Sequence, residues 1–431
     1  MPEKNGDRHF IKEKIVRQPL SKRQIARRII LTAFCGALFG VLAAVCFVVS
    51  KPVAERYLGQ EETTESGRIT IPKDEPETTA PPVTTAAPSE DEESEPVQEL
   101  VQSEISRYAY TAEDADRMFG AIRQVVAGVD RGVVSVHSIR HQVDWFDNPI
   151  ETTGQFAGVL INRTGNEGLI LTTEAAIADA DSIEVALSDG TLLEGAVKQR
   201  DTVGRMAVVS VDLSGLTAEQ KDRLTVVELG NSYSVKQGDL VAAVGSPVGA
   251  IHSADYGFVS YVVRNVQLID GQGRVFYTGI RGAADRGTFL INLEGQLIGW
   301  VTDEFGSSQE NGMTTVAGIS DYKGVLEDLS NGIAPSYFGV RGQEVGQEQV
   351  DAGTPRGVYV TESVTDSPAY NAGIQNGDII TAIGEAAINN VKDLQNHIEM
   401  LNAGDRVRVT VQRNGTEVYR ELEFEVEIGA R

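Results

Sequence analysis

The stretch Leu290-Ile291-Asn292-Leu293-Glu294-Gly295-Gln296-Leu297-Ile298-Gly299 decides the fold of the central part of this chain. Two short apolar runs flank Glu294-Gly295, a pair that favours a tight turn, so the stretch predicts a β-hairpin. Similar β-branched runs, separated by turns such as Asp189-Gly190, lie around it. The predicted strands are Gly132–His137, Ala157–Ile161, Gly168–Thr172, Ser182–Leu187, Ala207–Val211, Leu240–Val244, Gly257–Val263, Gly273–Tyr277, Thr288–Asn292 and Gln296–Thr302. Many short strands at this spacing predict an all-β barrel or sandwich.

The regions on either side of these strands have a different pattern. Apolar residues within Ala112–Ala127 recur at helical spacing and predict a helix before the first strand. After Ala334-Pro335 a second module mixes strands with a helix at Val391–Leu401, which predicts an α+β domain. Its predicted strands are Gly357–Thr361, Asp378–Ile383, Arg406–Arg413 and Glu417–Val426.

The amino-terminal part of the chain predicts a membrane anchor. Residues Ile29–Val49 form an apolar run of roughly 21 residues, long enough for a helix to cross about 30 Å of hydrocarbon. A secretory signal peptide is the alternative, but its apolar region is usually only about 7–15 residues, and no clear small-residue cleavage site follows here. Residues 1–28 are basic, so the positive-inside rule predicts a cytoplasmic tail. The protein is therefore expected to be a single-pass protein of the cell membrane, with the bulk of the chain extracytoplasmic.

Residues 50–111 predict a disordered acidic linker. Much of this segment consists of Thr, Pro, Glu, Asp, Ala and Ser and buries too little apolar surface to offset the ordering of its backbone. The formal net charge of −24 for the whole chain argues against a nucleic-acid partner. Both cysteines, Cys35 and Cys46, belong to the apolar run, so the extracytoplasmic region contains no disulfide. No motif predicts a metal ion or a cofactor.

Several segments of the β-rich region, taken in order, resemble the HtrA/Deg family of membrane-tethered, trypsin-like serine proteases. They are Gly158–Asn162, Gly168–Thr172, Leu187–Gly190, Leu229–Ser232, Val235–Asp239, Gly245–Gly249, Gly257–Ser260 and Leu290–Gly299. The resemblance implies a mainly β fold, with a trypsin-like double β-barrel over residues 112–333. A PDZ domain over residues 334–431 is implied to follow it.

The positions that would hold the catalytic triad of this family carry other residues. Ala175 stands where the resemblance places the histidine, Arg205 where it places the aspartate, and Arg286 where it places the serine. A serine protease of this type needs a nucleophilic oxygen, a base for its proton and a carboxylate to orient that base. Alanine has no proton acceptor, and arginine stays protonated at neutral pH. No catalytic residue is therefore predicted, and the two arginines either line an inert cleft or bind carboxylates.

The second module carries the most specific match to this family. The run Ser367-Pro368-Ala369-Tyr370-Asn371-Ala372-Gly373-Ile374-Gln375-Asn376-Gly377-Asp378-Ile379-Ile380 follows the PDZ pattern nearly throughout. Tyr337-Phe338-Gly339-Val340 resembles the carboxylate-binding loop, in which successive backbone N–H groups receive the terminal carboxylate of a peptide. Such a peptide adds as a strand to a sheet edge. His397 and Met400, on the predicted helix, are expected to border the peptide groove.

Together these features predict a membrane-anchored, extracytoplasmic pseudoprotease of the HtrA/Deg type. It is expected to act as a protein- or peptide-binding scaffold or regulator, through capture of C-terminal peptides or unfolded proteins by the PDZ domain. The resemblance also implies a homotrimer, or a hetero-oligomer with active relatives. Two alternatives stay open: an active HtrA-type serine endopeptidase of protein quality control with a displaced catalytic apparatus, and a chaperone-like holdase.

Overall fold

The computed structural model describes residues 68–75, 111–143, 149–305, 312–415 and 418–431. Within these ranges no helix is both long and apolar enough to cross a membrane. The cytoplasmic tail at residues 1–28 and the membrane helix at 29–49 lie outside the described residues and stay predictions.

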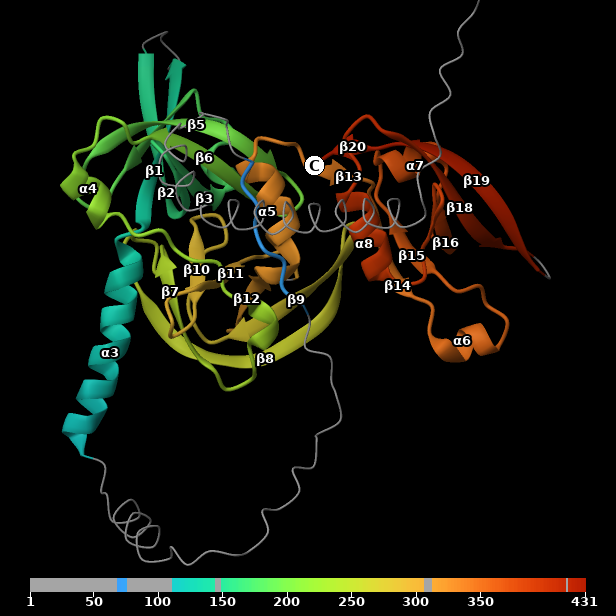
Figure 1. The fold of residues 1–431 in the computed structure, drawn as a ribbon, viewed down its shortest axis with the longest axis horizontal. Helices are drawn as coiled ribbons and strands as arrows, with labels where there is room; N and C mark the ends of the chain where they lie inside the picture. The colour runs from blue at the N-terminus through green and yellow to red at the C-terminus, as the bar shows by residue number, and fades with distance from the viewer. Residues whose placement is uncertain (1–67, 76–110, 144–148, 306–311, 416–417) are drawn as a thin grey trace, which may run out of the picture. The chain divides into compact units, whose positions relative to one another are not determined.

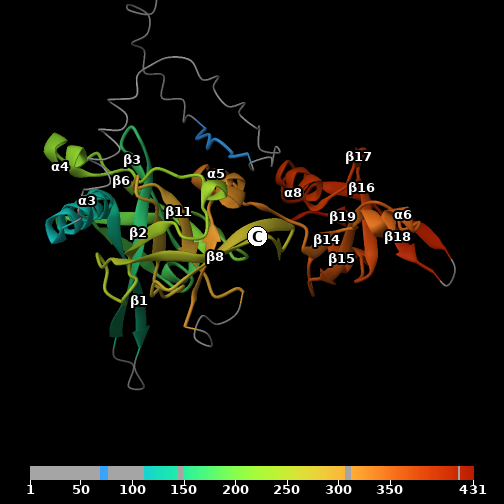
Figure 2. The same cartoon turned by 90° about the horizontal axis from the view of Figure 1, so that it is seen from below.

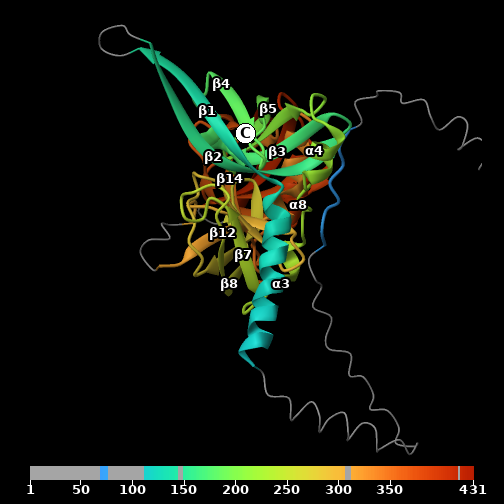
Figure 3. The same cartoon turned by 90° about the vertical axis from the view of Figure 1, so that its left-hand side faces the viewer.

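The helix predicted before the first strand is confirmed as α3 (Ala112–Asp130). It begins with a capping box, in which Thr111 and Asp114 satisfy each other's backbone N–H groups. Its buried residues are Ile122, Val126 and Val129. Figure 3 shows α3 running beside β7 (Leu240–Gly245) of the second barrel. The helix therefore shields part of the core with one apolar face, as its spacing predicts.

The first barrel closes in the strand order β1-β2-β3-β6-β5-β4, all antiparallel (Figure 1). The strands are β1 (Val133–Val143), β2 (Pro149–Thr164), β3 (Glu167–Thr173), β4 (Ser182–Ala186), β5 (Leu192–Asp201) and β6 (Met206–Asp212). The short helices η1 (Glu174–Ala176) and α4 (Ala218–Arg223) follow β3 and β6. Sequence patterning does not predict β5, because the strand is mostly exposed and its register shifts between Val197 and Gln199.

The second barrel closes in the order β10-β11-β12-β9-β8-β7. Besides β7, its strands are β8 (Asp255–Leu268), β9 (Gly271–Thr278), β10 (Thr288–Ile291), β11 (Leu297–Val301) and β12 (Thr314–Gly318). The helical segments around them are η2 (Ser232–Ser234), η3 (Ser320–Tyr322) and α5 (Lys323–Ser330). The hairpin predicted at Leu290–Gly299 is confirmed as β10 and β11, with Phe289 opposite Trp300. Strand β8 is longer than predicted and ends in a tight turn at Ile269-Asp270 before β9.

The α+β module predicted after Ala334-Pro335 is also confirmed. Its sheet has the order β14-β15-β16-β18-β19, with β17 paired to β16 and a separate β13-β20 pair. The strands are β13 (Ser336–Tyr337), β14 (Val340–Glu344), β15 (Val358–Ser363), β16 (Asp378–Ile383), β17 (Ala386–Ala387), β18 (Arg406–Asn414), β19 (Tyr419–Glu427) and β20 (Gly429–Ala430). The helices are α6 (Gln347–Asp351), α7 (Pro368–Ala372) and α8 (Val391–Glu399). In the sheet, β14 is an edge strand, as strand addition requires.

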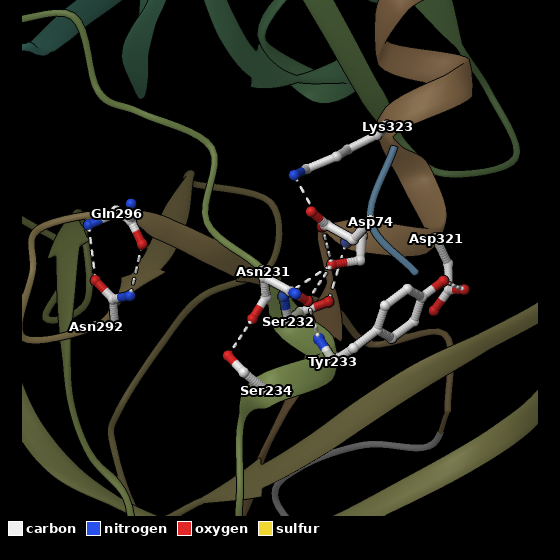
Figure 4. A network of polar contacts seen from close by, with 10 residues as sticks. Asp74, Asn231, Ser232, Tyr233, Ser234, Asn292, Gln296, Asp321 and Lys323 are labelled. Atoms are coloured by element: carbon white, nitrogen blue, oxygen red, sulfur yellow. Dashed lines mark hydrogen bonds and ion pairs between the residues drawn. The ribbon is translucent and has the colours of Figure 1, made fainter. Parts of the chain in front are cut away.

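Residues Arg68–Glu75, here called the docked segment, differ from the disorder predicted for the linker. The backbone N–H of Ile69 donates to Asn331, the C-cap of α5, and that of Ile71 donates to Glu327 within α5. Both apolar side chains pack against the barrel core. At its end the Asp74 carboxylate accepts from the Ser320 hydroxyl at 2.6 Å and pairs with Lys323 at 2.8 Å (Figure 4). Specific apolar and ionic contacts therefore offset the ordering of this part of the acidic linker.

Candidate functional site

A cleft of about 270 Å³ lies where the two barrels meet, and two of the three predicted triad positions line it. Ala175 reaches it from η1, and Arg205 reaches it from the turn before β6. The lining residues are Thr173, Glu174, Ala175, Thr202, Gly204, Arg205, Met206, Ala284, Asp285, Trp300, Val301, Thr302 and Asp303. None of these described residues is a histidine, serine or cysteine. They supply no imidazole base and neither a serine nor a cysteine nucleophile.

Arg205 is held in this cleft by its backbone and one ion pair. Its φ of 54° is left-handed, which non-glycine residues seldom adopt, and its carbonyl accepts from the N–H of Glu174 at 2.9 Å. Its Nη1 lies 2.8 Å from the Oδ1 of Asp303, and both side chains are more than half exposed. An exposed pair of this kind contributes at most about 1 kcal/mol to stability. The position that would hold a buried triad carboxylate thus holds a solvated cation.

Arg286, at the third triad position, has different partners. Its Nη1 donates to the Gln155 carbonyl at 3.3 Å, and its guanidinium carbon lies 5.9 Å from the centre of the Phe156 ring. It does not belong to the lining of the inter-barrel cleft. The structure therefore does not support the hypothesis of one carboxylate-binding groove built from Arg205 and Arg286.

The described histidines lie at separate places in the fold. His137 and His141 belong to β1, whereas His397 belongs to α8. The Nδ1 of His252 lies 3.1 Å from the Oδ1 of Asp130, and this hydrogen bond raises the pKa of His252 above 6.5. Within the described ranges no group of three or more His, Cys, Asp or Glu residues is placed to hold a metal ion.

The loop predicted to bind a peptide carboxylate already binds a carboxylate of this chain. The N–H groups of Phe338, Gly339 and Val340 donate to the Asp270 side chain at 2.8, 2.7 and 2.9 Å. Gly339 has a φ of 90°, and a Cβ at this position would overlap the Cβ of Ser367. Glycine is therefore required for the backbone turn that directs these N–H groups to one point. The predicted role of the loop as a carboxylate site agrees with this geometry.

Asp270 is a buried acid in the turn between β8 and β9. Its side chain is only 1% exposed, and this burial raises the pKa of its carboxyl group. The cationic side chain of Arg431 and the three N–H donors act in the opposite direction. Sequence reasoning missed this residue. Its one local signal is the pair Asp270-Gly271 between two predicted strands, which favours a turn but does not identify a partner.

The residues of α8 that lie near the turn between β8 and β9 are not the ones that the sequence predicts at the groove. Gln395 and Glu399, at i and i+4, line a small cavity together with Asp270 and Gly271. Met400 is 71% exposed, and His397 is only partly buried on another face of the helix. The expectation that His397 and Met400 border the groove stays a prediction. An amphipathic pattern defines the core side of a helix but not which flank meets a partner strand.

Tyr337 precedes the three donors and frames the loop. Burial and the nearby Asp270 carboxylate both raise the pKa of its phenol. A neutral tyrosine beside the carboxylate leaves the loop free of a second negative charge.

Comparison with known proteins identifies both domains. Residues 156–299 match the trypsin-like peptidase domain, and residues 336–427 match the PDZ domain. A serine protease Do-like HtrA of Lactobacillus helveticus is 26% identical over 294 residues, which are 64% of this chain and 70% of that protein. A serine endoprotease DegS of Haemophilus influenzae is 26% identical over 267 residues, which are 60% of this chain and 73% of that protein.

Among solved structures, the HtrA-type protease AlgW with decapeptide has the same fold. It aligns with a TM-score of 0.50 and 22% identity, covering 72% of this chain and 98% of that chain. The chain therefore has a mainly β trypsin-like domain followed by a PDZ domain, and it is similar to proteases of the HtrA/Deg family.

Proposed function

We propose that this protein is an HtrA/Deg-type pseudoprotease that binds the C-termini of other proteins through its PDZ domain. The observation that carries the proposal is the convergence of three backbone N–H groups of Phe338–Val340 on one carboxylate. Backbone donors recognise a free carboxylate whatever the side chains of the peptide, and strand addition at a sheet edge then supplies affinity. The protein acts in this proposal as a binding scaffold or regulator. Its ligand class is an extended peptide with a free C-terminus, from another protein or from an unfolded protein.

The inter-barrel cleft supports the pseudoprotease part of the proposal. Ala175 has no proton acceptor, and Arg205 places a cation where a triad histidine would need an anion. Arg286, whose guanidinium lies against Gln155 and Phe156, offers no nucleophile at neutral pH. The cleft keeps its place between the barrels, and no histidine, serine or cysteine is among the described residues that line it. This lining supports the proposed loss of proteolysis.

Casein cleavage and fluorophosphonate labelling of the purified protein test the loss of proteolysis. We expect neither cleavage nor labelling, under conditions in which a serine protease Do-like HtrA of another organism shows both. The names of the relatives favour the alternative, an active endopeptidase with a displaced catalytic apparatus. Cleavage that the fluorophosphonate abolishes would establish that alternative.

A peptide pull-down tests the binding function. Randomised peptides with a free carboxylate are expected to be retained, and the same peptides ending in a carboxamide are expected to be lost. Equal retention of both forms would contradict the carboxylate-dependent mode. Suppression of aggregation of an unfolded protein, without any dependence on its C-terminus, would instead favour the chaperone-like holdase.

The proposed location is the outer side of the cell membrane, with one helix at residues 29–49 as the anchor. The basic tail and the apolar run support this placement. Release of the protein from membranes by alkaline carbonate would contradict it. A homotrimer, or a hetero-oligomer with active relatives, is proposed from the family resemblance, and sedimentation of the detergent-solubilised protein measures it.

A further inference from the structure

One contact among the described residues joins the second barrel to the PDZ domain. The turn between β8 and β9 lies against β14 and α8, and both walls of the expected peptide groove contact it. Figures 1 and 2 both show the end of β8, drawn in yellow, extending to these elements. We propose that residues Gln267–Gly271 are an internal ligand of the PDZ groove, and that an external C-terminal peptide binds by displacing them. This proposal rests on the peptide-binding function proposed above.

The first argument is the position of the Asp270 carboxylate. Its Oδ2 accepts from the N–H of Phe338, and its Oδ1 accepts from the N–H groups of Gly339 and Val340. These three N–H groups are therefore all engaged by one carboxylate, which leaves no place for a second. Asp270 has a φ of 65°, a backbone conformation that residues other than glycine seldom adopt. The turn is thus held in an uncommon backbone conformation while its side chain meets the loop.

The second argument is that the turn adds to β14 as a strand does. The backbone N–H of Asp270 donates to the Val340 carbonyl at 2.7 Å, and Ile269 forms an antiparallel bridge with Arg341. Farther along, the Arg341 side chain donates to the Gln267 carbonyl at 3.1 Å. A backbone pairing of this kind, together with a bound carboxylate, is the pattern by which strand addition captures a C-terminal peptide.

The opposite wall of the groove is closed as well. A Cβ added to Gly271 would lie only 2.9–3.0 Å from the side chain of Gln395 on α8, so the turn and the helix are in close contact. Gln395 is only 7% exposed, and among the described residues its Oε1 has no hydrogen-bond partner. A buried amide oxygen without a donor is costly, and a peptide N–H in the groove would satisfy it. An incoming peptide and the turn cannot occupy this space together.

The internal ligand is also held in a way that allows exchange. Burial raises the pKa of Asp270, so its charged form is less stable in the groove than in water. A second carboxylate that takes over the three N–H donors returns Asp270 to solvent. The apparent association constant for an external peptide then equals the intrinsic constant multiplied by the fraction of molecules with an open groove.

The test compares the full chain with two variants, by fluorescence anisotropy of a labelled pool of randomised decapeptides with a free carboxylate. Asp270→Asn keeps the shape of the side chain and removes the carboxylate. Asp255→Asn makes the same change at the far end of β8 and is the matched control. We expect Asp270→Asn to raise the apparent affinity about tenfold or more, and the control to stay within about twofold. The amidated pool is expected to respond to neither change.

A locked variant tests the proposal independently of any folding defect in Asp270→Asn. Ile269→Cys with Arg341→Cys, in a chain whose Cys35 and Cys46 are serine, places a disulfide across the antiparallel bridge. Oxidation is expected to abolish binding of the free-carboxylate pool, and reduction is expected to restore it. Equal binding by the wild type, Asp270→Asn and the oxidised locked form would overturn the internal ligand while the PDZ function stands. Absence of carboxylate-dependent binding in every form would overturn both.

Discussion

Replacement of Gly339 by alanine tests whether the carboxylate loop depends on this backbone geometry. Gly339 has a φ of 90°, and its added Cβ would overlap the Cβ of Ser367, the N-cap of α7. Gly384 is the matched control, because its φ is 59° and nothing lies within 4 Å of an added Cβ. Both substitutions force alanine into the left-handed region, and only one of them also forces an overlap.

The expected cost follows from these two contributions. A left-handed conformation costs a non-glycine residue roughly 1–2 kcal/mol, which applies to both Gly339→Ala and Gly384→Ala. Overpacking in a closely packed region adds typically about 1–3 kcal/mol, which applies to Gly339→Ala alone. We therefore expect a loss of about 2–5 kcal/mol at Gly339 and of about 1–2 kcal/mol at Gly384. The loop that shifts to relieve the overlap also loses the convergence of its N–H groups, so peptide binding falls.

Hydrogen exchange of the full chain, followed by mass spectrometry, measures the opening free energy of peptides from β14 to β16. Ser367→Gly removes the Cβ that would overlap. Loss of the N-cap costs roughly a few tenths of a kcal/mol, and the variant also loses the hydrogen bond that Ser367 donates to the Gly339 carbonyl. The double variant should therefore be more stable than the sum of the two single losses predicts. The reasoning is refuted if Gly339→Ala costs no more than Gly384→Ala, or if Ser367→Gly recovers nothing.

Three further predictions concern other parts of the chain. Tyr322→Phe removes the 2.9 Å hydrogen bond to the buried Asp201 carboxylate and should lower the unfolding free energy in urea by about 1.5–3 kcal/mol. Asp130 raises the pKa of His252. The stability difference between wild type and His252→Gln should therefore be largest below about pH 6.5, and it should vanish as pH rises through the folded-state pKa. Asp74→Asn removes the carboxylate partner of a buried lysine and should speed hydrogen exchange throughout the docked segment.

Each of these predictions has an outcome that contradicts it. A loss below about 0.5 kcal/mol in Tyr322→Phe would mean that the buried carboxylate finds another donor at no cost. A stability difference for His252→Gln that grows with rising pH would contradict a raised pKa of His252. NMR titration of the imidazole ring measures that pKa directly. Unchanged exchange in Asp74→Asn would mean that the apolar contacts and hydrogen bonds of Ile69 and Ile71 hold the docked segment without this ion pair.

Most strands with β-branched runs were predicted, but β12 was missed although it contains Thr314, Thr315 and Val316. The hairpin at Leu290–Gly299 is local, because its two runs pair across one tight turn. Strand β5 was missed, because Asp201 is its only buried residue and its register shifts between Val197 and Gln199. Strand β14 was missed as well, although it starts inside the loop that the family resemblance identified. Its pairing with β15 depends on long-range contacts that local patterning does not encode.

The docked segment shows the same limit for the linker. Composition predicts disorder for residues 50–111, since it averages over the segment and is dominated by acidic and small polar residues. Ile69 and Ile71 are two apolar residues in that background, and their partners on α5 lie more than 250 positions away. No local stretch of the sequence contains both these isoleucines and their hydrogen-bond partners.

By itself the strand pattern of the sequence determined an all-β region followed by an α+β module, because local periodicity and turn residues are readable along a chain. The family resemblance implied the double barrel, the triad positions and the carboxylate-binding loop, and the assignment of the triad positions stays a prediction. Only the tertiary structure decided what the loop binds in this protein. Asp270 lies 68–70 positions before its donors, and it meets them because β8 runs past the second barrel to an open sheet edge. A side chain becomes a ligand only where packing places it, and packing is set by both domains at once.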